Sequence, residues 1–241
     1  MAPSGGERAD VQRGLAELAS RYELTDRQTG QLRRLLDGVE ADPRAPTTVR
    51  EARAALDVHV ADSLVALQLD FVREAQSIAD LGAGAGFPGI VLAIVLPDSV
   101  VSLLESQARK CVFMEAIVAA TGVENAHVVN ARAEDWQEGI GAHELITARA
   151  VGPQEVVLEY AAPLLAPSGR FVDWRGRRDH EAEAVAMAAA QELGLRRLEV
   201  RPVEPFAGAR ELHLHLFEKI AETPARFPRR TGLARKRPLG L

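Results

Sequence analysis

Asp80-Leu-Gly-Ala-Gly-Ala-Gly-Phe-Pro-Gly89 is the stretch that decides the fold of this chain. It follows the short apolar segment 77–81 and leads into the apolar run 90–96, so a strand, a tight turn and a helix are expected in that order. Its alternate glycines let the backbone turn sharply and approach a ligand where any Cβ would collide. Pro88 suits the first turn of a helix because it lacks an N–H. The stretch therefore predicts the entry to a nucleotide-type cofactor site.

Two cofactors fit the spacing of this loop. From Asp80 it has the form Asp-x-Gly-x-Gly-x-Gly, usual in enzymes that bind S-adenosylmethionine. From Gly84 it has the form Gly-x-Gly-x-x-Gly, the dinucleotide pattern. Either cofactor needs an acid for its ribose hydroxyls about 20 residues further on, and Glu105 meets this need at the end of the apolar run 100–104. The loop alone leaves both alternatives open.

Length, cysteine content and hydropathy narrow the class of protein. The chain has 241 residues, enough for one α/β domain with an extension. Its single cysteine, Cys111, excludes an intramolecular disulfide and indicates a reducing compartment. No apolar stretch approaches the ~20 residues that span a bilayer, and the N-terminus lacks the basic and apolar regions of a signal peptide. We therefore expect a cytoplasmic protein with no membrane association.

Charge is unevenly distributed along the chain. The formal net charge is −5, yet residues 224–241 contain six basic residues and no acid. A basic tail on an acidic protein, with Phe227 available for stacking, suits contact with nucleic-acid phosphates. The alternative is a solvated run of charge at the chain end. The basic residues are Arg226, Arg229, Arg230, Arg235, Lys236 and Arg237.

Hydrophobic periodicity separates a helical part from a mixed part. Apolar residues recur at helical spacing in 7–22, after 26 and in 54–72. From residue 77 short apolar strands alternate with helices, which implies a parallel sheet with crossovers. The strands are expected at 78–81, 100–105, 127–129, 145–149, 170–174, 196–203 and 211–218, and the helices between them at 88–95, 107–121, 153–165 and 179–193. This predicts a helical extension (1–73), a cofactor-binding domain (74–220) and a basic tail (221–241).

The last two expected strands have no helix between them and therefore form a hairpin. A dinucleotide-binding domain normally continues with a second parallel half. The class I methyltransferase sheet instead has seven strands, of which the last is antiparallel, so the hairpin favours S-adenosylmethionine over NAD. His213 and His215 share one face of the last strand with no cysteine or acid nearby, so we expect surface histidines and no metal site.

Taken together, the motifs resemble one family: the bacterial 16S ribosomal RNA guanine-N7 methyltransferases, called ribosomal RNA small subunit methyltransferase G or glucose-inhibited division protein B. The matching pieces are His59-Val-Ala-Asp-Ser-Leu64, the glycine loop, Leu103-Leu-Glu-Ser106 with Lys110, Arg132-Ala-Glu134, Ile146-Thr-Ala-Arg-Ala-Val151, Pro163-Leu-Leu165, Phe227-Pro-Arg-Arg-Thr-Gly232 and Lys236-Arg-Pro-Leu239. The resemblance implies a class I Rossmann-like α/β fold with a seven-stranded, mostly parallel sheet, an antiparallel last strand and an N-terminal helical extension. It also implies methylation of a guanine in the decoding region of 16S rRNA, in the small ribosomal subunit or its precursor, by a monomer.

The resemblance also assigns roles to cofactor residues. Glu105 would bind the ribose hydroxyls, as the loop spacing also suggests, and Arg149 would lie in the cofactor pocket. The methionine end would lie against the loop residues Gly82, Gly84, Gly86 and Phe87, and the adenine against Ala133 and Glu134.

Catalysis and RNA binding make different demands. Guanine N7 has an in-plane lone pair and no proton, so methyl transfer needs positioning more than a general base. The residues expected to assist are Arg149, Arg132 and the carboxylate of Asp62, with Glu134 as a second candidate carboxylate. The residues expected to contact RNA are His59, Arg132, Arg175, Arg229 and Arg230. Arg175 stands where the family usually has lysine, so a planar fork replaces a point donor. An NAD-dependent oxidoreductase and a non-catalytic ribosome-binding module are the alternatives.

Overall fold

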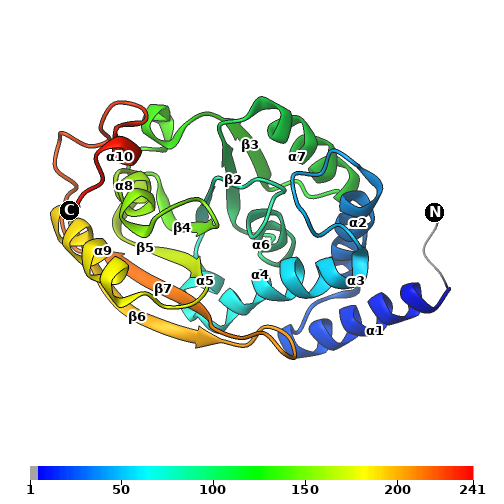
Figure 1. Ribbon diagram of the computed structural model, residues 1–241. Coiled ribbons are helices and arrows are strands. Elements are labelled where there is room, and N and C mark those ends of the chain that lie inside the picture. Colours follow the sequence, from blue (N-terminus) through cyan, green and yellow to red (C-terminus); the bar gives the residue numbers. More distant parts are fainter. Residues whose placement is uncertain (1–4, 241) are drawn as a thin grey trace.

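The computed structural model describes residues 5–240, which form a seven-stranded sheet with helices on both faces (Figure 1). The strands are β1 Ser77–Leu81, β2 Val100–Glu105, β3 Ala126–Asn130, β4 His143–Arg149, β5 Leu165–Arg175, β6 Leu195–Val203 and β7 Leu212–Lys219. Their order is β3-β2-β1-β4-β5-β7-β6, with β7 antiparallel to both of its neighbours and β1 to β5 parallel. The expected class I methyltransferase sheet, with its closing hairpin, is confirmed.

Alternation along the strands builds a separate hydrophobic core on each face of the sheet. In the neighbouring pair Leu103 and Leu104, the first side chain belongs to one core and the second to the other. The first core packs against α6 Gly89–Val95 and α7 Ala108–Thr121, and the second against α8 Gln154–Leu164 and α9 His180–Glu192. The result is a three-layer α/β/α arrangement.

The N-terminal helices belong to the first of these cores. They are α1 Gly5–Tyr22 and α2 Asp26–Ala41, and α2 begins with a capping box between Thr25 and Gln28. Gln31 of α2 donates a 3.0 Å hydrogen bond to the carbonyl of Gly122 at the end of α7. Residues of both helices are buried in the same cluster as residues of β1, β2 and β4. The extension is thus an integral layer of the molecule.

The single helix expected at 54–72 is wrong. The segment is broken into α3 Ala52–Ala55, a π-helical turn η1 Leu56–Ala61, α4 Asp62–Leu64, the 3-10 turn η2 Val65–Gln68 and α5 Asp70–Glu74. Leu69 is extended, with φ −105° and ψ 113°, and it ends the first helical stretch. Apolar spacing cannot reveal a π-helical turn, because one inserted residue barely disturbs the pattern.

The expectation of a surface histidine is wrong for His215. β7 lies inside the sheet, and His215 points to the same face as Phe217, which packs in the core with α8 and α9. His215 is therefore buried, with neither ring nitrogen bonded to a described residue. Burial lowers the pKa of His215 to about 4, so the ring is neutral. His213 remains at the surface, with its Nδ1 3.1 Å from the carbonyl of Gly176.

The last helix, α10 Leu233–Lys236, belongs to the basic tail, which folds back against α8 (Figure 1). Between residues 5 and 240 no helix has the length and apolar character to cross a membrane.

Candidate active site

Asp80 closes the glycine loop between β1 and α6. Its carboxylate is fully buried and accepts hydrogen bonds from Thr147 Oγ1 at 2.8 Å and from the Gly89 backbone N–H at 2.9 Å. Burial raises the pKa of Asp80 to about 6, against the effect of these two donors. A Cβ on Gly89 would lie 2.8 Å from Asp80 Oδ2, so the end of the loop can approach the strand only as glycine.

The loop needs its glycines for conformation as well as for space. Gly82 and Gly86 have φ values of 64° and 94°, in the left-handed region that side chains disfavour. A Cβ on Gly82 would lie 3.0 Å from Val151 Cγ2, and one on Gly86 would lie 2.2 Å from Ile90 Cδ1. The loop therefore presents backbone rather than side chains beside the end of β1.

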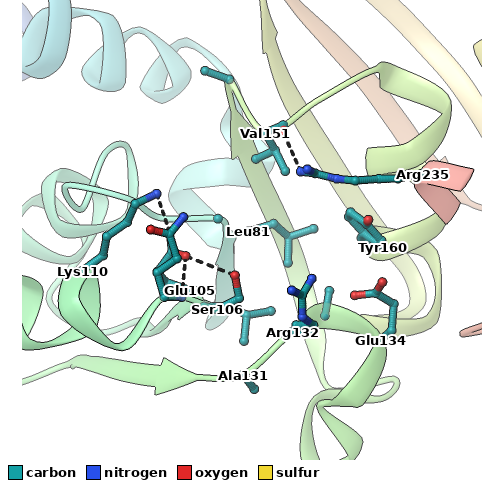
Figure 2. A pocket seen from close by; sticks show the side chains of 15 residues that line it. Leu81, Glu105, Ser106, Lys110, Ala131, Arg132, Glu134, Val151, Tyr160 and Arg235 are labelled. Carbon is teal, nitrogen blue, oxygen red and sulfur yellow. Dashed lines mark hydrogen bonds and ion pairs between the residues drawn. The ribbon is translucent and has the colours of Figure 1, made fainter. Parts of the chain in front are cut away.

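A cavity of about 320 Å³ lies at the carboxyl ends of β1, β2, β3 and β4 (Figure 2). Parallel α/β sheets bind their ligands at this edge. The cavity brings together four residues that sequence reasoning assigned to the cofactor, namely Gly82, Glu105, Ala133 and Glu134, and Arg132 lies beside them. The other lining residues are Leu81, Leu104, Ser106, Gln107, Lys110, Ala131, Ala150, Val151, Tyr160 and Arg235.

Glu105 is fixed in place at the end of β2. Only 4 % of the residue is exposed, and its Oε1 accepts a 2.9 Å hydrogen bond from the Gln107 backbone N–H. Its Oε2 lies 3.4 Å from Lys110 Nζ, which balances the buried charge. A carboxylate has about four lone-pair positions. Glu105 therefore keeps acceptor capacity for a pair of hydroxyls in the cavity.

Arg149 makes a different set of contacts, with the broken helical segment 52–74. Its Nη1 donates to Asp62 Oδ2 at 2.7 Å and to the Val58 carbonyl at 3.0 Å, and its Nη2 lies 3.3 Å from His59 Nδ1. The guanidinium lies over the ring of Phe87, 5.6 Å from its centroid. Gly84, Gly86, Phe87 and Arg149 are not among the described residues that line the cavity, so their predicted cofactor roles stay predictions.

His59 is a buried, neutral member of this cluster rather than a cation at the surface. Its ring stacks on Phe87 with centroids 4.5 Å apart, and its Nε2 lies 2.9 Å from Thr47 Oγ1. Burial, together with the charge of Arg149, lowers the pKa of His59 to about 4. A neutral, enclosed ring offers no charge to RNA phosphates, and the contact of His59 with RNA stays a prediction. Burial raises the pKa of Asp62, and Arg149 opposes that shift.

The family model described as rRNA small subunit methyltransferase G matches residues 44–212. The chain belongs to this family. It is 36 % identical over 197 residues to ribosomal RNA small subunit methyltransferase G of Pelotomaculum thermopropionicum, covering 80 % of this chain and 82 % of that protein. It is 34 % identical over 223 residues to the protein of the same name from Chloroflexus aggregans, covering 90 % and 92 %. The family resemblance drawn from the motifs is thus confirmed.

Solved structures agree with this methyltransferase G membership at the level of fold. An S-adenosylmethionine-dependent methyltransferase from Aquifex aeolicus superposes with a TM-score of 0.54 at 16 % identity, covering 69 % of this chain and 93 % of that one. An O-methyltransferase from Thermotoga maritima gives 0.52 at 18 % identity, covering 67 % and 65 %. Family and fold together resolve the choice of cofactor: the chain is an S-adenosylmethionine-dependent methyltransferase.

Two of the arginines that were expected to contact RNA form hydrogen bonds within this methyltransferase G chain. Arg175 Nε donates to Asp173 Oδ2 at 2.6 Å and its Nη1 donates to the Gly152 carbonyl at 2.7 Å. Arg229 Nε donates to Glu159 Oε1 at 2.6 Å, and a second bond joins the same two side chains. The contacts of Arg229 and Arg175 with RNA stay predictions, and Arg175 ties the end of β5 to the loop after β4 with a quarter of its side chain exposed.

Arg132 and Arg230 fit the RNA-binding prediction better. Both are exposed, and within residues 5–240 neither side chain forms a hydrogen bond or an ion pair. Arg132 lies at the cavity, directly before the 3-10 turn η3 Ala133–Asp135. Their contact with RNA stays a prediction.

Among the cavity residues that sequence reasoning did not assign to the cofactor, Lys110, Tyr160 and Arg235 carry charged or hydroxyl groups. Lys110 was noted only as part of a family motif, and the available signal was its position five residues after Glu105, in the helix that follows β2. Tyr160 lies on α8, where burial raises the pKa of its hydroxyl and the neighbouring charge of Glu134 adds to the effect. Arg235 comes from the tail, and no pattern in the sequence indicates that the tail folds onto the cavity.

Proposed function

We propose that this chain transfers the methyl group of S-adenosylmethionine to N7 of a guanine in the decoding region of 16S rRNA. The observation that carries the proposal is the cavity at the edge of the sheet, which joins Gly82 to Glu105 and to the turn at Ala133 and Glu134. Family membership supports the ribosomal RNA substrate. We further propose that the enzyme acts as a monomer in the cytoplasm, on the small subunit or its precursor.

The cavity residues fit the parts of the cofactor. Glu105 is a buried carboxylate at the end of the second strand, suited to accept two ribose hydroxyl hydrogen bonds. The turn that begins at Ala133 offers backbone and a carboxylate to the adenine. The glycine loop offers close backbone approach to the methionine end, because a side chain at Gly82 would fill that space. S-adenosylmethionine supplies an electrophilic methyl group on a sulfonium centre.

The side chains mainly position the reactants. Guanine N7 needs no general base, so the task of the protein is to hold N7 in line with the methyl group. Asp62 carries its charge beside Arg149, which offsets much of its field at the guanine. Glu134 accepts a 2.9 Å hydrogen bond from the Gly232 backbone N–H and lies on the adenine side of the cavity. Asp62 and Glu134 both stay candidate carboxylates for favouring positive charge at the reacting centre.

The test is methyl transfer from labelled S-adenosylmethionine to unmodified small subunits and to free 16S rRNA, followed by mapping of the modified nucleotide. We expect one labelled guanine, with label retained at N7. The Glu105→Ala variant should lose most of the activity, whereas Glu124→Ala, an exposed acid outside the cavity, should keep it. RNA binding without methylation would favour the ribosome-binding module. Binding of NADH without binding of S-adenosylmethionine would favour the oxidoreductase.

A further inference from the structure

The tail at residues 227–240 is a built part of the molecule rather than a solvated end (Figure 1). Phe227, Ala234 and Leu239 are buried in the core on the α8 and α9 side of the sheet. The Arg229 guanidinium forms two hydrogen bonds with Glu159 of α8, and Glu159 is only 1 % exposed. If the tail undocked, this carboxylate would lose its partner. We call residues 227–240 the C-terminal strap.

The strap also holds one wall of the cavity. Its Gly232 backbone N–H donates to Glu134 Oε1 at 2.9 Å, and Thr231 Oγ1 donates to Asp135 Oδ1 at 2.5 Å. Both acceptors lie in η3, the turn that lines the adenine side of the cavity. The conformation of this turn therefore depends on strap residues 98 and 96 positions further along the chain.

Arg235 extends from α10 across the opposite side of the cavity (Figure 2). Its Nη2 donates to the Val151 carbonyl at 3.2 Å. The Val151 side chain in turn abuts the glycine loop, since a Cβ on Gly82 would lie 3.0 Å from it. Arg235 also lies beside the Tyr160 hydroxyl and opposes the rise that burial causes in its pKa. Its guanidinium is thus placed near the end of the cavity formed by the glycine loop.

Among the described residues, three cations line the cavity, and their surroundings distinguish them. Lys110 lies beside the Glu105 carboxylate, which offsets its charge. Arg132 directly precedes η3 and lies near Glu134, on the adenine side. Arg235 is the cation on the Val151 side, and within residues 5–240 it forms no ion pair with an acidic side chain.

We propose that Arg235 binds the methionine carboxylate of S-adenosylmethionine, so that the C-terminal strap completes the cofactor site. The assignment rests on the proposed function for the orientation of the cofactor, with its methionine end at the glycine loop. A guanidinium presents parallel N–H donors that match a carboxylate in two-point geometry.

Two adenosine compounds test this assignment with binding alone. S-adenosylhomocysteine carries the amino-acid carboxylate, whereas 5′-methylthioadenosine has the same adenosine and sulfur without it. We would measure both dissociation constants by calorimetry on the full chain and on the Arg235→Ala, Arg235→Lys, Arg132→Ala and Lys236→Ala variants. Lys236 is the matched control, an exposed cation next to Arg235 that does not line the cavity. Thermal melting of each variant reports whether the strap is still docked.

Arg235→Ala should weaken S-adenosylhomocysteine roughly 10- to 100-fold, as expected for one charge-assisted contact, and should change 5′-methylthioadenosine affinity less than about threefold. Arg235→Lys should recover part of the loss. Arg132→Ala and Lys236→Ala should leave the ratio of the two affinities as in the wild type.

Equal weakening of the two compounds by Arg235→Ala would overturn the assignment, because it would show a general effect of the strap on the pocket. A changed ratio in Arg132→Ala alone would give the carboxylate to Arg132 instead and would also overturn it. If the wild type bound neither compound, the proposed function would fail together with the assignment. Unmodified affinity in Arg235→Ala would overturn only the role of Arg235.

Discussion

Arg149 and Asp62 form an ion pair at 2.7 Å that joins the carboxyl end of β4 to the broken helical segment 52–74. Their side chains are only 17 % and 12 % exposed, so each charge depends on the other. Trp174, at the end of β5, donates a 2.9 Å hydrogen bond to the Asp62 carbonyl and ties the same point to a second strand. The edge of the sheet that carries the cavity is therefore braced by residues outside the cavity.

Removing Arg149 should destabilise the protein. Arg149→Ala leaves the Asp62 carboxylate buried without its partner, which typically costs about 3–5 kcal/mol. The more exposed pair of Arg53 and Asp57, 2.8 Å apart with side chains 44 % and 32 % exposed, is the control, and Arg53→Ala should cost less than about 1 kcal/mol. Urea unfolding monitored by circular dichroism measures both. Similar losses in the two variants would show that the Arg149 pair is not effectively buried.

Two neighbouring arginines should give opposite results. Arg229→Ala strands the buried Glu159 carboxylate and should lower the free energy of unfolding by about 3–5 kcal/mol. Arg230→Ala removes an exposed cation and should leave stability within about 0.5 kcal/mol while weakening RNA binding and reducing its salt dependence. Filter binding to 16S rRNA at several salt concentrations, with thermal melting, separates the two effects. An unchanged salt slope in Arg230→Ala would remove that residue from the RNA contact.

Replacing Gly82 should damage cofactor binding specifically. Gly82 and Gly141 have the same φ of 64°, so Ala at either position pays the same conformational cost of about 1–2 kcal/mol. Only at Gly82 would the new methyl group meet Val151 and enter the cavity, since nothing lies within 4 Å of a Cβ on Gly141. We expect similar melting temperatures for Gly82→Ala and Gly141→Ala, with S-adenosylhomocysteine affinity lost in the first alone. Equal affinities would place the cofactor away from Gly82.

Stability should depend on pH through His143. This buried ring, at the start of β4 and tilted against Trp136, has no hydrogen-bond partner for either nitrogen among the described residues, and burial lowers its pKa to about 4. Below pH 6.5 the unfolded chain binds a proton that the folded chain refuses, so stability falls as the pH drops towards 4. His143→Phe should remove roughly 2 kcal/mol of the loss between pH 7.5 and pH 5. Urea unfolding at both pH values would contradict this prediction if the two proteins lost the same free energy of unfolding between pH 7.5 and pH 5.

The sheet could be predicted from the sequence because its signals are local. The strands that include Leu103 and Leu145 are short apolar runs bounded by turn residues, and the glycines mark the loop that follows β1. Residues at the ends of parallel strands meet at one edge, which is why Gly82 and Glu105 could be assigned to one site from the sequence, whereas Glu134 was assigned from the family resemblance.

The remaining features depend on contacts between distant residues. Arg229 and Glu159 are 70 positions apart, and Arg149 and His59 are 90 apart, so no local pattern connects them. A basic tail has the same composition whether it is solvated, bound to RNA or folded onto its own domain. The burial of His215 follows from the helices that cover its face of the sheet, since alternation along a strand does not say whether a face is covered by helices or open to water.

The division of the interior by the sheet has a consequence for how this enzyme can change. Leu81, Leu104 and Tyr160, the apolar wall of the cofactor cavity, pack in the core with α8 and α9, whereas the helix that carries Asp62 packs in the other core. Side chains separated by the sheet share few contacts, so substitutions in the two compartments should have additive effects on stability. Substitutions could thus accumulate in the N-terminal layer while the apolar wall of the cavity is inherited intact.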